Sequence, residues 1–160
     1  MAYFAPTALD DALTLIAEQD VSIIAGGTDV FPVQGQAPWK NDLLDVTRID
    51  GLSGLQWGPE GLRIGAATPW SEIVKADLPD CYAGLQAAAR TVGSVQIQNS
   101  GTIAGNICNA SPAADGMPPL ITLGAEVEIT GPNGVRQIPV EEFVTGPRQT
   151  QLRAGELVIA

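Results

Sequence analysis

Two glycine-rich stretches constrain this chain more than any other feature. The first is IIAGGTDVFP, residues 23–32, where two β-branched residues run into consecutive glycines. The second lies within residues 94–125 and contains NSGTIAGNICNASPAAD, with Thr and Asn side chains between its glycines. Each stretch alone is typical of a tight turn. Together they indicate one extended, polar but largely uncharged ligand held by backbone, such as a dinucleotide, and neither has the G-x-G-x-x-G spacing of a Rossmann site.

The charge balance excludes several classes of function. The chain carries a formal net charge of −10 and no Lys/Arg cluster, so duplex nucleic acid would be repelled. An anionic ligand would have to be held by backbone N–H groups rather than by a field of lysines. The complete absence of His removes Ser-His-Asp triads, His-ligated metals and imidazole proton shuttles.

The small number of cysteines further limits the chemistry of this chain. Cys81 and Cys108 are the only two cysteines, too few to hold an iron–sulfur cluster. If electrons move through this chain, an organic cofactor must carry them, and any cluster must belong to a partner. We therefore predict no metal ligand and no catalytic side chain. Cys108 itself is expected to be a small apolar wall residue.

At 160 residues the chain can form one compact domain or two small packed lobes. Residues 1–57 predict a small parallel α/β lobe, with a helix over residues 6–20 capped by Thr7 and strands at 21–25 and 42–46. Residues 58–160 predict a larger α+β lobe with an antiparallel sheet. Its expected elements are a strand at 61–67, a helix at 68–76 capped by Thr68, a helix at 81–92, a helix at 117–123 capped by Ser111 or Asp115, a hairpin over 125–139 and a strand at 156–160.

No apolar run is long enough to cross a bilayer, and residues 1–13 lack the pattern of a signal peptide. We therefore expect a cytoplasmic protein without a membrane span.

Several motifs together resemble a known family. AGGTD, then NSGTIAGNICNASPAAD, LGAEVEI and FVTGPRQTQLRAGELV are similar, in order and approximate spacing, to the FAD-binding medium subunit of the molybdenum hydroxylases. This is the xanthine dehydrogenase and carbon monoxide dehydrogenase family, with a p-cresol-methylhydroxylase-type FAD-binding fold. The similarity covers essentially all of the chain. It also implies that the sequence ends before the C-terminal domain of the family.

The resemblance implies which residues contact FAD. Main-chain amides of the two stretches would wrap the pyrophosphate, Asp115 would contact a hydroxyl-bearing part of the cofactor, and Val92 and Leu157 would lie against its rings. Two positions depart from the pattern: Gln98 stands in place of Arg, and Ala104 in place of Gly. The amides in question belong to Ile24, Ala25, Gly26, Gly27, Thr28, Asp29, Thr102, Ile103, Ala104, Gly105 and Asn106.

Two charged residues leave alternatives open. A carboxylate beside a phosphate is unfavourable, so Asp29 is expected either to cap backbone N–H groups or to contact a hydroxyl. Arg148, in GPRQT, is either a partner in a structural ion pair or a contact for an anion at the site.

The function implied by the resemblance is electron transfer. FAD on this chain would take electrons from a [2Fe-2S] subunit, fed by a molybdenum-cofactor subunit, and pass them to NAD, oxygen or another acceptor. One alternative is another flavin oxidoreductase on the same FAD fold, although the stretches supply no acid or base to act over the flavin. A second alternative is a non-catalytic assembly module, which would have no affinity for flavin even with the C-terminal domain of the family restored.

Overall fold

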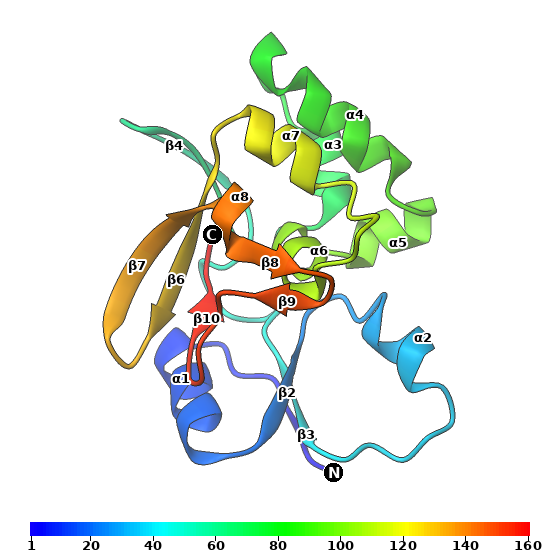
Figure 1. The fold of residues 1–160 in the computed structure, drawn as a ribbon, viewed down its shortest axis with the longest axis vertical. Coiled ribbons are helices and arrows are strands. Elements are labelled where there is room, and N and C mark those ends of the chain that lie inside the picture. Colours follow the sequence, from blue (N-terminus) through cyan, green and yellow to red (C-terminus); the bar gives the residue numbers. More distant parts are fainter.

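The computed structural model describes residues 1–160. It has two lobes that pack against each other (Figure 1). Its strands are β1 (Tyr3–Phe4), β2 (Val21–Ile24), β3 (Asp42–Asp45), β4 (Leu55–Gly58), β5 (Gly61–Ile64), β6 (Glu126–Gly131), β7 (Gly134–Pro139), β8 (Val144–Gly146), β9 (Gln149–Thr150) and β10 (Leu157–Val158). Its helices are α1 (Leu9–Glu18), α2 (Val30–Gln34), α3 (Trp70–Lys75), the 3₁₀ turn η1 (Asp80–Tyr82), α4 (Ala83–Thr91), α5 (Val95–Ser100), α6 (Ile103–Asn109), α7 (Met117–Thr122) and α8 (Val140–Phe143).

The N-terminal lobe is a parallel sheet with one covering helix. Its three strands lie in the order β1-β3-β2, and β2 pairs with β3 from Val21 opposite Asp42 to Ile24 opposite Asp45. The α1 helix buries Ala12 completely, because apolar residues recur along one of its faces. Because all three strands are parallel, the loops that follow β2 and β3 leave the sheet at the same edge. The predicted parallel lobe is confirmed.

The second lobe combines an antiparallel sheet with a group of short helices. The sheet has the order β10-β6-β7, and the β6–β7 hairpin turns between Gly131 and Gly134. The helices α3, α4, α5 and α7 gather on one side of this lobe, and α6 lies between them and the N-terminal lobe (Figure 1). The mixed α and β architecture predicted from the sequence is confirmed. The predicted lobe division between residues 57 and 58 falls within the β4–β5 hairpin and stays a prediction.

A short strap, residues 66–68, ties the lobes together. The Ala66 N–H donates to the Ile159 carbonyl at 3.1 Å, and the Ala67 N–H donates to the Leu52 carbonyl at 2.7 Å. On its other side, carbonyls of the strap accept hydrogen bonds from the start of α6. One continuous hydrophobic core, from Ala12 in α1 to Ile159, packs around this strap.

Three predicted helix caps are wrong. Ala8, not Thr7, precedes α1, and Pro69, not Thr68, precedes α3; neither helix has a side-chain cap. Thr68 is buried instead, and its hydroxyl exchanges hydrogen bonds with the Gly54 backbone at 2.9 and 3.2 Å. The cap predicted for α7 from Ser111 or Asp115 is also absent, because Gly116 occupies that position. At Thr68, these long-range hydrogen bonds override the local capping signal.

The second glycine-rich stretch is largely helical rather than a loop. The Ser94 hydroxyl accepts from the Ile97 N–H at the start of α5, and the Thr102 hydroxyl accepts from the Gly105 N–H at the start of α6. Ile103 and Ile107, one turn apart, bury the core-facing side of α6. This burial outweighs the low helix propensity of glycine. Ala104, which stands where the family has Gly, is a helical residue of α6 and has no positive φ, so its backbone conformation does not require glycine.

The two glycine stretches meet at Gly26. A Cβ atom at this position would lie 1.7 Å from the Ser100 carbonyl oxygen, so only glycine lets the two backbones approach. Gly27 is required for a different reason: its φ is +67°, in the left-handed region. The connection from β2 to α2 therefore closes against the end of α5 (Figure 1).

No helix in the structure is long and apolar enough to cross a membrane.

We predict that Gly26→Ala destabilises the chain by more than about 2 kcal/mol, because two backbones must separate to admit one methyl group. Thermal and urea unfolding would measure the loss. Gly84→Ala is the matched control: Gly84 lies in α4 with open space where a methyl group would point, so this change should stabilise by about 0.5–1 kcal/mol. Equal stability of Gly26→Ala and the unchanged chain would contradict the close approach.

Candidate functional site

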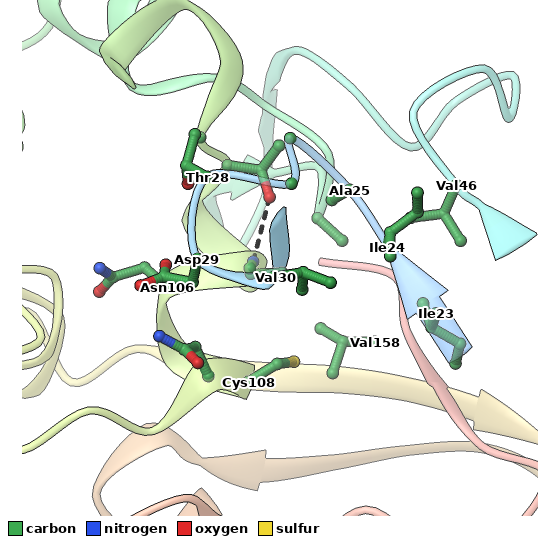
Figure 2. Close-up of a pocket in the computed structure, with 18 of the residues that line it drawn as sticks. Ile23, Ile24, Ala25, Thr28, Asp29, Val30, Val46, Asn106, Cys108 and Val158 are labelled. Atoms are coloured by element: carbon green, nitrogen blue, oxygen red, sulfur yellow. Dashed lines mark hydrogen bonds between the residues drawn. The ribbon is translucent and has the colours of Figure 1, made fainter. Parts of the chain in front are cut away.

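A cavity of about 460 Å³ lies where the two lobes face each other. Its walls come from the loop after β2, from Val46 after β3, from α6 and the turn that follows it, and from β10. Figure 2 shows Ile24 and Val46 on one side of the cavity and Asp29 and Asn106 on the other. The predicted residues that line it are Ile24, Ala25, Gly26, Gly27, Thr28, Asp29, Val92, Thr102, Ala104, Gly105, Asn106 and Leu157.

Two predicted site residues are not brought to this cavity. Ile103 is buried at 6% exposure and lines a second cavity, of about 610 Å³, on the opposite face of α6. Asp115 is exposed, in the turn before α7, outside the cavity wall. Ile103 does not line the first cavity because the helical period turns successive residues of α6 to different faces. The sequence pattern of this stretch is typical of a turn and does not predict this.

The loop after β2 presents unpaired backbone donors. The N–H groups of residues 25–29 donate to no acceptor in the protein, although the Gly27 and Asp29 carbonyls accept hydrogen bonds from α2. The loop leaves the carboxyl end of a parallel strand, where ligands commonly bind in α/β sheets. A run of open N–H groups with no Lys or Arg in the cavity wall suits an anion that is held by backbone.

The opposite wall is different, because its N–H groups are already paired. The Ile103 N–H donates to the Thr68 carbonyl at 3.0 Å, and the Ala104 N–H donates to the Ala66 carbonyl at 3.2 Å. Thr102 accepts hydrogen bonds from the next two N–H groups. Its hydroxyl accepts from the Gly105 N–H at 3.0 Å, and its carbonyl accepts from the Asn106 N–H at 3.1 Å. Residues 103–106 therefore shape the wall of the cavity but offer it no free backbone donor.

Asn106 contributes a side chain instead. Its Oδ1 atom accepts a hydrogen bond from the Gly116 N–H at 3.2 Å, which fixes the side chain between α6 and the turn before α7. The two Nδ2 hydrogens have no protein acceptor, so they are available to a ligand.

A buried carboxylate in the wall was not predicted from the sequence. Glu156 is 8% exposed and accepts hydrogen bonds from Arg136 Nε at 2.9 Å, from Arg136 Nη2 at 2.7 Å and from the Arg153 N–H at 2.9 Å. Hydrogen bonding to Arg136 lowers the pKa of Glu156 from its usual 4.5 to about 2, and the same bond raises the pKa of Arg136. Twenty residues separate the partners, so no local sequence pattern reveals the pair.

Cys108 behaves as the sequence suggests. Burial raises the pKa of its thiol to about 12, so it stays protonated at neutral pH. Figure 2 shows its side chain lying toward Val158 across the lower part of the cavity. With no second cysteine paired to it, Cys108 is a small apolar wall residue.

Arg148 has a role that neither sequence alternative anticipated. Its Nη1 group donates to both the carbonyl and the side-chain oxygen of Asn109, and its N–H donates to the Ala110 carbonyl at 2.8 Å. No carboxylate lies within ion-pair distance of it. Arg148 thus caps the carboxyl end of α6, where a cation complements the helix dipole, and it accepts a φ of +58° to do so.

The sequence and the fold place the chain among known proteins. All of residues 1–160 match the family described as the FAD binding domain in molybdopterin dehydrogenase. The chain belongs to this family. It is 34% identical over 166 residues to a xanthine dehydrogenase FAD-binding subunit of Escherichia coli O157:H7, covering 99% of this chain and 56% of the relative.

Solved structures agree with this assignment. A carbon monoxide dehydrogenase from Hydrogenophaga pseudoflava superposes with a TM-score of 0.93 at 27% identity, and quinoline 2-oxidoreductase from Pseudomonas putida 86 with a TM-score of 0.92 at 26% identity. The first match covers 99% of this chain and 57% of the other. The chain thus spans somewhat more than half the length of the relatives it matches. Both the family and the FAD cofactor inferred from the motifs are confirmed.

The residues present fit FAD. A cavity of this volume is within the range of small-molecule sites, although it opens to solvent and would leave part of a dinucleotide uncovered. The open N–H groups of residues 25–29 match a pyrophosphate, and the apolar side chains of Val92, Leu157 and Val158 match a ring system.

We predict that Glu156→Gln lowers the free energy of unfolding at pH 7 by about 1–3 kcal/mol, because it removes one charge of a pair whose side chains are 23% and 8% exposed. Folding lowers the pKa of this carboxyl to about 2, so the ion pair stabilises fully above pH 4.5 and loses its effect as pH falls toward 2. The difference in unfolding free energy between the two proteins should therefore shrink over that interval in urea titrations.

Glu128→Gln serves as the control for this experiment. It breaks the Arg63–Glu128 pair, whose side chains are 37% and 21% exposed, and should cost clearly less at pH 7. A difference between Glu156→Gln and the unchanged chain that does not vary from pH 7 to 3 would contradict the assignment.

The Thr102 hydroxyl provides a separate prediction. Thr102→Val keeps the shape of the side chain but leaves the Gly105 N–H without an acceptor, which should cost about 1–2 kcal/mol in chemical unfolding. Thr102→Ser retains the hydroxyl and should cost clearly less. If the valine and serine variants were equally stable, the cap would contribute nothing.

Proposed function

We propose that this chain holds FAD in the cavity between its lobes and serves as the flavin-binding part of a molybdenum hydroxylase. The observation that carries the proposal is the run of unpaired N–H groups at residues 25–29, facing a cavity in a chain of this family. Backbone donors can hold a pyrophosphate on a chain with a net charge of −10, in which Lys and Arg are few.

The chain's residues would divide the work of binding. The amides of Ala25 to Asp29 would hold the pyrophosphate, and the side chain of Asn106 would donate from the opposite wall. Ile24, Val92 and Leu157 would contact the apolar rings. Thr102, Ala104 and Gly105 would shape the wall without donating, and Ile103 would support α6 from behind. Asp115 stays a predicted hydroxyl contact.

The wider role follows from the relatives. FAD supplies the capacity to accept and release electrons, while the chain binds it and sets its surroundings. Xanthine and carbon monoxide dehydrogenases are the assemblies named for similar chains, so a molybdenum-cofactor subunit and a [2Fe-2S] subunit are the partners we propose. The route of electrons from those clusters through FAD to NAD, oxygen or another acceptor belongs to the same proposal, as does a cytoplasmic location.

An FAD titration of the 160-residue chain tests the function, with flavin fluorescence and visible absorbance as readouts. We predict saturable binding and a weakening of at least about tenfold in Ala113→Glu, because Ala113 is an exposed residue of the cavity wall and the change adds a negative charge to a cavity that would hold an anion. Ala87→Glu is the matched control, since Ala87 is exposed on α4 and outside the cavity.

The outcomes separate the alternatives. Binding that Ala113→Glu weakens and Ala87→Glu leaves unchanged supports the cavity as the flavin site. Equal binding by both variants would move the flavin elsewhere on the chain. If the folded chain bound no FAD, the proposal that these 160 residues hold the flavin by themselves would fail.

A further inference from the structure

Trp70 is a buried residue whose indole N–H has no acceptor in the protein. It is the first residue of α3, it is 1% exposed, and it lines the cavity between the lobes. Its backbone N–H donates to the Gly101 carbonyl at 3.1 Å, whereas its side-chain Nε1 group makes no hydrogen bond. The N–H of a buried Trp usually has a partner, so this donor requires an explanation.

The unpaired N–H is open to the cavity and is not sealed within the core. Every side-chain nitrogen or oxygen of the chain that is shut off from solvent has a hydrogen-bond partner. Because Nε1 has none, the small exposed part of Trp70 includes this atom. Trp70 lines the cavity between the lobes and not the second cavity, so its free N–H faces the proposed flavin site.

Two glycines show where the N–H edge of the indole ring lies. A Cβ atom at Gly101 would be 3.6 Å from Trp70 Cδ1 and 3.3 Å from the Thr28 hydroxyl oxygen. A Cβ atom at Gly116 would be 3.2 Å from Trp70 Cζ2 and 2.8 Å from Asn106 Oδ1. Nε1 lies between Cδ1 and Cζ2 on the edge of an indole ring, so this edge extends from Thr28 toward Asn106. Both residues lie on the same side of the cavity (Figure 2).

We propose that the Trp70 indole N–H donates a hydrogen bond to a phosphate oxygen of the bound cofactor, an inference that rests on the proposed function. Thr28 belongs to the loop of open N–H groups at residues 25–29, so a pyrophosphate on that loop lies beside the indole edge. Indole N–H only donates, and an ionised phosphate oxygen accepts. A neutral side-chain donor also suits a cavity wall that contains no Lys or Arg.

The burial of Trp70 prepares its N–H for this role. The ring is part of the hydrophobic core, so the N–H is held in one direction before a ligand arrives and little freedom is lost on binding. A hydrogen bond to a charged group typically changes an equilibrium constant by about tenfold or more. Trp70 thus serves the core with its ring and the cavity with one atom of that ring.

The test records the indole ¹⁵N–¹H signals of the 160-residue chain while FAD is added, and separately while riboflavin, which has no phosphate, is added. The chain has three Trp residues, and Trp39 and Trp57 line neither cavity, so their signals are internal controls. We expect FAD to move the Trp70 N–H proton signal downfield and to slow its exchange with water, because a hydrogen bond forms. Riboflavin should cause neither change.

Trp70→Phe supplies a second measurement, because it removes the N–H and keeps an aromatic ring. It should weaken FAD binding by about tenfold or more and change riboflavin binding clearly less. Phe143→Leu is the matched control: Phe143 is fully buried and lines neither cavity, so this change reduces the core without removing a donor. It should leave the FAD affinity of the folded chain unchanged. Unfolding curves of both variants establish the folded fraction.

The outcomes separate this inference from the proposed function. If flavin fluorescence shows that the unchanged chain binds FAD, but the Trp70 signal neither moves downfield nor exchanges more slowly, the inference is overturned and the proposed function stands. This result does not depend on whether Trp70→Phe folds. Equal FAD affinity of folded Trp70→Phe and the unchanged chain would also overturn it. If the unchanged chain binds no flavin, the proposal that these residues hold FAD fails, and the inference fails with it.

Discussion

The arrangement of the site depends on the hydrogen bonds of residues 66–68. This strap binds the Ile159 carbonyl after β10 with one edge and the first N–H groups of α6 with the other. The Thr68 hydroxyl adds bonds to the Gly54 backbone. Since β10 and α6 form two walls of the cavity, the strap sets the distance between them.

The strap also explains why the two glycine-rich stretches have different roles in the cavity. At α6, the N–H groups of Ile103 and Ala104 donate to the strap, so this wall has no free backbone donors. The loop after β2 has no such neighbour and keeps its N–H groups unpaired. A pair of stretches that look alike in sequence therefore separates into one binding loop and one supporting wall.

The charges in the cavity wall limit how it can bind an anion. With no cation in the wall, an anion must rely on oriented N–H dipoles. The two carboxylates in the wall differ: Glu156 is paired with Arg136, whereas the Asp29 side chain does not cap the helix that follows it.

Much of the fold could be predicted from the sequence, because its signals are local. Period-2 and period-3.6 patterns placed α1, β2, β3 and the β6–β7 hairpin. The motifs and the resemblance they carry indicated the family, the cofactor and twelve of the 27 residues that line the cavity. The acidic, His-free composition determined that any phosphate must be held by backbone. These properties depend on residue type and short spacing alone.

Only the tertiary structure decided which backbone donors are free, where α6 turns Ile103, and that Glu156 pairs with Arg136. It also decided that Gly26 serves a contact between two backbones rather than the ligand directly. Each of these depends on groups distant in the sequence competing for the same hydrogen bond or the same space. The sequence contains the interacting groups, but which of them pair depends on distances that exist only after the lobes have packed.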